Sequence, residues 1–270
     1  MVNCASQILK QINFFMKFHL LKYCDKCIKG DMMDIFGLIE PYPLVEPNPT
    51  QWDRIAYMRD NGMDSNDQET IDFINGKNTK IVLALKTIKT PIELLKEVVN
   101  TKSHKFPNLL HDKLKQCYIY KSAVANCPNL KNVPNIHTYR VKYSKAILSG
   151  VNKEIQRHCK YLAKNQIIFH GGVWPASSEL KIGSVFQTNR PISTSLCPEV
   201  AYVHSKYHNG GQIWVITISK ERLAKAYIFK TTGNQKSKHE YEILLEEGLN
   251  FKCTSLENMN KLTVVYIDVV

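Results

Sequence analysis

The stretch KHEYEILLEEG, residues 238–248, combines two carboxylates one residue apart with an apolar run. Glu240 and Glu242 come first, and an isoleucine and two leucines follow at once. Because side chains two apart in a strand point to the same face, both acids are expected to face one cleft. Adjacent like charges are destabilising unless a partner or a chemical task holds them. A solvated strand end is the competing interpretation.

The sequence around this stretch predicts a β-rich second half. From Gln166 onward, short β-branched or aromatic segments are separated by polar or glycine-bearing ones. The segments are QIIFHGG, PISTSL, QIWVITI, KAYIFK, YEILLEE and KLTVVYIDVV. Each is expected to form a strand.

The first half predicts helices instead. Residues 5–23 have apolar side chains near helical spacing, and residues 66–75 and 79–88 also favour helix. Four prolines within residues 39–52 exclude helix and central strand, so a linker or an extended wrap is expected there.

A sharper helix start lies at residues 90–99. Thr90 can cap, Pro91 suits the first turn, and Glu93 completes a capping box.

Helices followed by strands indicate an α+β fold. The turn-rich segment NCPNLKNVPN, residues 126–135, marks the main expected boundary. We therefore predict a helical N-terminal region at 1–134, which packs on the core or docks a target, and a second domain at 135–270 that carries the chemistry.

Composition limits the classes of partner and the redox compartment that are expected for this chain. The chain has 270 residues, 44% of them hydrophobic, and a formal net charge of +12. Such a charge suits anionic ligands, but Lys and Arg are spread along the chain and no nucleic-acid motif is visible, so nucleic acid is not the expected partner. Eight scattered cysteines predict reduced thiols, and Cys24 with Cys27 are expected to be unconnected thiols rather than a metal site.

No targeting or membrane segment is expected. Lys10, Lys17 and Lys22 interrupt the apolar N-terminus, which argues against a signal peptide. No run approaches the roughly 18 apolar residues of a membrane span. A soluble protein is predicted, either cytoplasmic or delivered into another cell.

Three segments of the second half carry chemistry only in combination. FHGG at residues 169–172, PISTSL at 191–196 and EYE at 240–242 each favour an ordinary strand when taken alone. Their order and spacing change this interpretation. With their flanks, they resemble the mono-ADP-ribosyltransferases of bacterial-toxin type, over residues 135–270. The matching residues are His170-Gly171, Ser193-Thr194-Ser195 and Glu240-Tyr241-Glu242.

The resemblance implies a fold and a reaction. The expected core has two packed, mostly antiparallel β-sheets. The expected activity is transfer of ADP-ribose from NAD, the co-substrate, to a protein side chain, with release of nicotinamide and no metal. An acid at the position of Glu240 accompanies arginine acceptors in the family, so a target arginine is expected.

The residues also suggest roles. Breaking the nicotinamide–ribose bond requires stabilisation of an oxocarbenium-like sugar, and Glu242 is expected to do this through the ribose 2′-OH. His170 suits a ribose hydroxyl, and Ser193 is expected to orient Glu242. The resemblance implies that Gly171 offers its backbone to the nicotinamide carboxamide. Thr194 and Ser195 are expected to line the cleft.

Two roles are less fixed. An aromatic ring is expected to stack on nicotinamide, with Tyr202 or Tyr207 as the candidates. Family members with Ser-Thr-Ser and Glu-x-Glu usually have Arg where this chain has His170, so the phosphates need another cation, and Arg190 is the nearest in sequence.

Other functions stay open from the sequence alone. An NAD glycohydrolase uses water as the acceptor, and a degenerate binding module keeps the fold without activity. A basic nucleic-acid binder is the weakest alternative.

Overall fold

The computed structural model describes residues 35–77, 80–81, 83, 85–207, 211–219, 222–231 and 240–270. The helix expected at 5–23 and the Cys24–Cys27 pair lie outside these residues. Among the described residues, no helix has the length and apolar character needed to cross a membrane.

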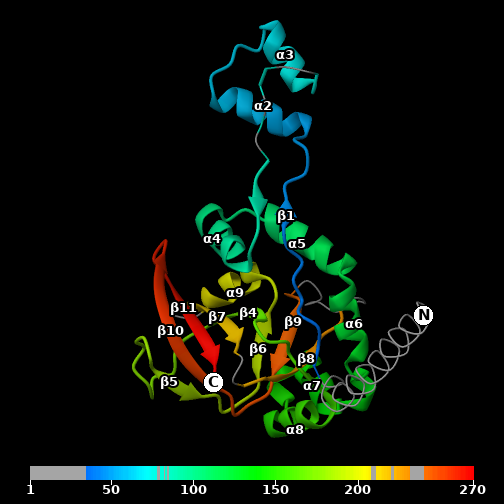
Figure 1. Ribbon diagram of the computed structural model, residues 1–270, viewed down its shortest axis with the longest axis vertical. Helices are drawn as coiled ribbons and strands as arrows, with labels where there is room; N and C mark the ends of the chain where they lie inside the picture. Colours follow the sequence, from blue (N-terminus) through cyan, green and yellow to red (C-terminus); the bar gives the residue numbers. More distant parts are fainter. Residues whose placement is uncertain are drawn as a thin grey trace, which may run out of the picture.

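Helices precede most of the strands, as the α+β prediction requires (Figure 1). The helices in chain order are α2 (Gln51–Asp60), α3 (Gln68–Ile74), α4 (Pro91–Thr101), α5 (Lys105–Gln116), α6 (Tyr118–Asn126), α7 (Pro134–Val141), α8 (Leu148–His158) and α9 (Pro198–Ser205). Short 3-10 turns at Leu130–Asn132 and Tyr143–Lys145 flank α7.

A nine-stranded sheet forms the body. Its strands in spatial order are β3 (Lys160–Tyr161), β8 (Lys225–Ile228), β9 (Glu242–Leu245), β6 (Ile192–Ser195), β4 (Ile167–Gly172), β7 (Gln212–Ile218), β11 (Leu262–Val269), β10 (Asn250–Met259) and β5 (Val185–Gln187). Neighbours are antiparallel except β7 and β11, which are parallel. All six predicted strands are present, whereas the short β3 and β5 and the long β10 were not predicted.

The expectation of two packed sheets is wrong for the described residues. One ladder connects the nine strands, and its two parts meet where β4 and β6 pair only at Phe169 and Ser195. β4 continues past this point with β7 as its partner, and β6 pairs along its length with β9. This single residue pair therefore joins the two ladders into one sheet.

The helix predicted at 79–88 is also wrong. The described residues there are irregular and end in the short strand β2 (Thr87–Ile88), which pairs with β1 (Leu44–Val45). Ile88 is buried by this pairing, so tertiary contact decides the conformation of a segment that is apolar enough for either state. The helix expected at 66–75 is confirmed as α3, but α2 begins at Gln51, just after the prolines, and was not expected.

The sharper helix start is confirmed in α4. The Thr90 side chain accepts a hydrogen bond from the Glu93 N–H at 3.1 Å, and Pro91 occupies the first turn. The Glu93 carboxylate accepts from the Lys89 N–H at 2.7 Å rather than from Thr90, so the capping box is displaced by one residue. The helix buries Leu94, Leu95, Val98 and Val99.

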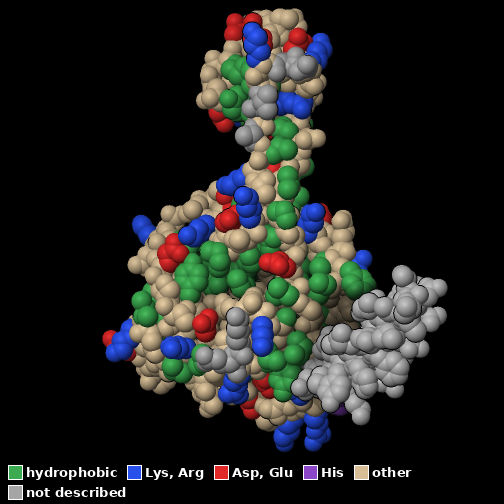
Figure 2. Space-filling model, in the orientation of Figure 1, with side chains coloured by type: hydrophobic (Ala, Val, Ile, Leu, Met, Phe, Trp, Pro, Cys, Tyr) green, Lys and Arg blue, Asp and Glu red, His purple; other side chains and the backbone are tan. Residues whose placement is uncertain are grey.

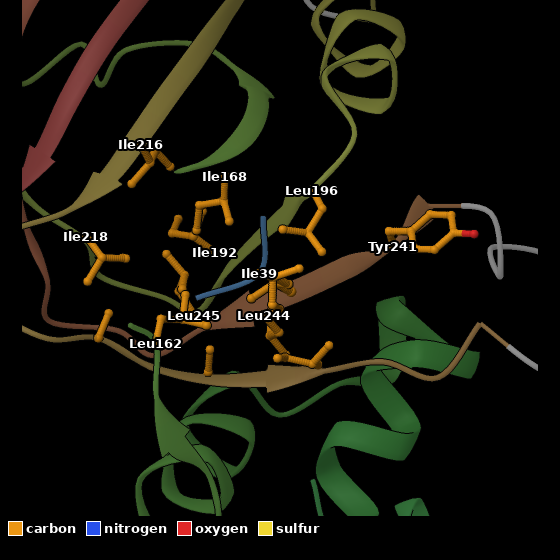
Figure 3. Close-up of a cluster of buried hydrophobic side chains, with 14 of the residues drawn as sticks. Ile39, Leu162, Ile168, Ile192, Leu196, Ile216, Ile218, Tyr241, Leu244 and Leu245 are labelled. Atoms are coloured by element: carbon orange, nitrogen blue, oxygen red, sulfur yellow. The ribbon is translucent and has the colours of Figure 1, made fainter. Parts of the chain in front are cut away.

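One hydrophobic core spans both halves of the chain. It contains Phe36 and Leu44 from the first half and strand residues as far as Val269. Figure 3 shows how Ile39 lies among strand residues such as Ile168 and Leu244. A boundary between 134 and 135 stays a prediction, and α7 begins at Pro134.

Candidate active site

A cavity of about 440 Å³ brings together most of the predicted site residues. Seven of the nine line it: His170, Gly171, Ser193, Thr194, Ser195, Glu240 and Glu242. They come from β4, β6 and the segment that enters β9, which lie side by side in the sheet. The single residue pair that joins β4 and β6, Phe169 and Ser195, also lines this cavity.

The three hydroxyls of β6 fasten the acidic segment. The Ser193 Oγ donates a hydrogen bond to the Glu242 carboxylate at 2.7 Å, and the Thr194 Oγ1 donates to the Ile243 carbonyl at 2.7 Å. The Ser195 Oγ donates to the Glu240 carbonyl. Each residue of Ser-Thr-Ser thus bonds a different residue of the acidic segment, which fixes the position of Glu242.

Glu242 is the first residue of β9, and its side chain is only 7% exposed. Burial raises the pKa of Glu242, while the Arg140 guanidinium and the Ser193 hydroxyl oppose that rise. A carboxylate in such surroundings depends on its charged and hydrogen-bonded partners to stay ionised.

Arg140 is the functional residue that the sequence analysis missed. It comes from α7, its side chain is 6% exposed, and its NH1 donates to a Glu242 oxygen. The same nitrogen lies 3.5 Å from a Glu240 oxygen, and the guanidinium lies 4.8 Å from the centroid of the Phe229 ring. The chain has only six arginines, so a search for a counter-ion to the acidic pair could have tested each of them.

Glu240 does not lie on the strand, contrary to expectation. β9 begins at Glu242, and Tyr241 has a φ of +47°, in the left-handed region that non-glycine residues rarely adopt. Tyr241 is buried, donates a hydrogen bond from its hydroxyl to the His111 carbonyl at 3.0 Å, and stacks on the His111 ring. These contacts hold a strained backbone that turns both carboxylates toward Arg140.

His170 is tied to the same hydroxyl strand. Its Nδ1 lies 2.6 Å from the Ser193 carbonyl oxygen, and because a carbonyl only accepts, Nδ1 carries the proton. In the neutral ring, Nε2 is therefore the acceptor nitrogen.

At each of the two glycines after His170, a different neighbour leaves no room for a Cβ. A Cβ at Gly171 would meet the Ala201 carbonyl of α9 at 2.2 Å, so this glycine lets α9 pack on β4. A Cβ at Gly172 would meet the His170 Nε2 at 2.5 Å, so this one leaves room for the imidazole.

The remaining two predicted residues lie outside this cavity. Arg190 lines a second cavity of about 890 Å³, which shares His170 and Gly171 with the first. Tyr202 packs against the core, with the Lys206 ammonium 3.9 Å from its ring centroid, and Tyr207 is 76% exposed. The aromatic residues that line the first cavity are Tyr139, Tyr143 and Phe169. The two tyrosines were not predicted.

Comparison with known proteins gives structural matches only. No protein-family model matches the chain, and no curated protein matches it in sequence. The chain matches solved structures of bacterial ADP-ribosyltransferase toxins. They include the ADP-ribosyltransferase Vis in complex with an inhibitor, at a TM-score of 0.48 and 16% identity over 67% of this chain and 90% of that one. Vis is a toxin from Vibrio splendidus.

Two further matches have lower scores. The enzymatic component C2-I of the C2 toxin from Clostridium botulinum matches at a TM-score of 0.41 and 15% identity, over 56% of this chain and 46% of that one. C3stau2 from S. aureus, solved with NAD, matches at a TM-score of 0.40 and 10% identity, over 56% of this chain and 92% of that one. At TM-scores below 0.5, these likenesses carry no weight for function, which must come from the site itself.

Proposed function

We propose that the chain is a mono-ADP-ribosyltransferase that moves ADP-ribose from NAD to an arginine side chain of a protein and releases nicotinamide. The observation that carries the proposal is the double contact of Ser193. Its hydroxyl donates to Glu242 and its carbonyl accepts from His170. The two chemical groups that the reaction needs are therefore positioned by one residue on one cavity wall.

Glu242 has the surroundings that stabilise a developing cation. When the bond from ribose C1′ to nicotinamide breaks, its electron pair leaves with nicotinamide, and the sugar becomes oxocarbenium-like. Glu242 accepts a hydrogen bond from the ribose 2′-OH, and that bond strengthens as positive charge develops. A carboxylate has about four acceptor sites, so the bonds from Ser193 and Arg140 leave capacity for this hydroxyl.

The two adjoining cavities offer room and partners for a dinucleotide. His170 and Gly171 lie on the wall common to both cavities, and the His170 Nε2 accepts from a ribose hydroxyl. Arg190 in the second cavity provides the cation for the phosphates that the first strand lacks. Tyr139 and Tyr143 provide aromatic surface beside the acids, a position that better suits stacking on nicotinamide than that of Tyr202.

Arginine as the acceptor fits the acidic pair. The Glu240 side chain is 25% exposed, at the open side of the buried Glu242. The pair already accommodates one guanidinium, that of Arg140, with its NH1 3.5 Å from a Glu240 oxygen. Glu240 therefore orients the incoming guanidinium, which attacks C1′ through a nitrogen and gives its proton to the Glu240 carboxylate.

Labelled NAD tests the reaction and the acceptor together. The protein is incubated with the label and a cell lysate, and mass spectrometry identifies the modified side chain. We expect labelled arginine with the native chain. Glu240→Gln is expected to keep nicotinamide release and lose the label, whereas Glu179→Gln, an exposed acid outside the cavity, should behave as the native chain.

Three results would contradict the proposal. Label on a different side chain would exclude arginine. Nicotinamide release by the native chain that is no faster with a protein acceptor than without one would indicate an NAD glycohydrolase. Calorimetry that detects no binding of NAD at millimolar concentration would leave only a binding module with this fold. Delivery into another cell as an effector stays a prediction of the sequence resemblance.

A further inference from the structure

The helices α2 and α3 form a projection that stands away from the sheet (Figures 1 and 2). We call residues 50–77 the helical arm. Its stalk is the short antiparallel pair of β1 and β2, with Leu44 opposite Ile88 and Val45 opposite Thr87. The polypeptide thus leaves the body and returns to it through two adjacent strands.

The two helices of the arm bury few residues, so internal packing gives the arm little stability. α2 buries none of its residues, and in α3 only Thr70 and Phe73 are buried. A contact between the Tyr57 and Phe73 rings, with centroids 5.7 Å apart, joins the two helices, while Trp52 is 78% exposed. Helices of ten and seven residues are marginal without tertiary packing. An exposed tryptophan is also a residue type that protein interfaces favour.

The charge of the arm is opposite to that of the rest of the chain. Residues 50–77 contain six Asp and Glu against three Lys and Arg, a net charge of −3. The remaining residues have 18 acidic and 33 basic side chains, a net charge of +15. Asp53, Asp60, Asp64, Asp67 and Glu69 are exposed. Positive charge on a partner favours its binding to this acidic surface.

The stalk is fastened to the same helix that holds the acidic segment of the site. Glu46 accepts from the Lys86 N–H at 2.9 Å and forms an ion pair with Lys105, at the start of α5. Nearly two turns further along the same helix, the His111 carbonyl accepts from the Tyr241 hydroxyl. α5 therefore connects the stalk of the arm to the segment that carries Glu240 and Glu242.

We propose that the helical arm is the docking element for the protein substrate, and that it binds a basic surface next to the acceptor arginine. The proposal rests on the proposed function. An acidic arm attracts the positively charged part of a target, two such arms repel each other, and Trp52 supplies an apolar anchor.

Deletion of the arm tests this proposal. Because β1 and β2 are antiparallel neighbours, residues 47–85 can be replaced by a short Asn-Gly turn that closes the hairpin. A core histone serves as the basic protein probe, and arginine methyl ester serves as a small acceptor that cannot reach the arm. We expect kcat/KM for the histone to fall by roughly 10- to 100-fold, the scale of electrostatic steering. Modification of the ester and release of nicotinamide should not change.

A charge reversal provides a second variant, which retains the caps of both helices. Asp60→Lys with Glu69→Lys spares Asp53 and Asp67, which cap the two helices. The matched control is Glu40→Lys with Glu179→Lys, which changes the net charge equally at exposed positions of the body. We expect only the arm pair to weaken binding of the histone, measured without NAD at low salt, and the difference should shrink as salt screens the charges.

The outcomes separate this proposal from the proposed function. Histone binding and modification that are equal with and without the arm would overturn the docking proposal. So would an equal loss for histone and ester, because the arm would then support the cavity itself. A native chain that is dimeric by light scattering, and monomeric after the deletion, would assign the arm to self-association. A native chain that never cleaves NAD contradicts the proposed function, and the binding measurement still decides the role of the arm.

Discussion

Ser193 contacts both chemical groups of the candidate site through different atoms, and Arg140 contacts both acids. Glu242 has a raised pKa because it is buried, and Arg140 with Ser193 works against that rise. The proposed reaction needs the ionised carboxylate, which these two neighbours favour. Arg140 is a positioning residue in this arrangement, since it acts through Glu242 and Glu240.

Loss of Arg140 should move the acidic limb of the pH profile. In Arg140→Met, the charge that holds the pKa of Glu242 down is removed, so this pKa rises further. Since the reaction needs the carboxylate, nicotinamide release should fail at higher pH than in the native chain. Initial rates from pH 5 to 9 measure the limb. Arg157→Met, at an exposed arginine of α8, is the control, and superimposable profiles for both variants would contradict the role of Arg140.

The same change predicts the sign of a stability effect. A carboxyl whose folded pKa is raised binds its proton more tightly in the fold, so stability decreases as pH rises from the unfolded pKa through the folded one. Arg140→Met enlarges this rise. Its melting temperature should therefore fall below that of the native chain by more at pH 8 than at pH 5. An equal difference at both values would argue against an ionised Glu242.

At the scale of elements, the site depends on how α9 and β4 approach each other. Gly171 permits this approach, because a Cβ there would meet backbone, whereas Gly172 only makes room for a side chain. The sequence HGG by itself does not reveal this difference between the two glycines.

Two alanine substitutions at adjacent positions should have different effects. Gly171→Ala displaces α9 from β4 and should cost about 1–3 kcal/mol or more of unfolding free energy, as overpacking does. Gly172→Ala displaces the His170 ring, so it should lower activity while costing less stability. Thermal or urea unfolding and the rate of nicotinamide release measure the two effects. Equal losses of stability for both variants would contradict this division.

Much of the element order could be predicted from the sequence, and the failures have identifiable causes. The strand that begins at Glu242 is a continuous apolar run, so its entry into the core was readable, whereas the exclusion of Glu240 from it was not. The segment at 79–88 is also apolar, but pairing with β1 decides its conformation, and no local signal shows this. Ser193 and Glu242 are recognisable because motif and spacing identify them. Arg140 comes from a helix about 100 residues earlier, and only the folded chain brings it to the acids.

At the scale of the whole molecule, helices from the first half complete the core of the sheet. Gln166 at the start of β4 receives a hydrogen bond from the Ile39 N–H at 2.8 Å, and α5 supplies the carbonyl that holds Tyr241. The predicted boundary at 134/135 therefore lies within one shared core, and helices continue past it to His158.

Residues 135–270 alone should not fold. Without the first half, apolar residues such as Leu244 and Tyr241 lose their cover. We expect the fragment to lack a cooperative thermal transition by circular dichroism and to release no nicotinamide, whereas the full chain shows both. A fragment with a sharp transition and activity would establish 135–270 as an independent domain.

The central claim is that Glu242 stabilises the sugar of bound NAD during bond cleavage. The most direct measurement is the rate of nicotinamide release at saturating NAD by the native chain and by Glu242→Gln, with NAD affinity measured by calorimetry on both. We predict a rate roughly 100- to 1,000-fold lower in the variant, with little change in affinity, because the lost interaction strengthens only in the transition state. Equal rates for the two proteins would contradict the claim.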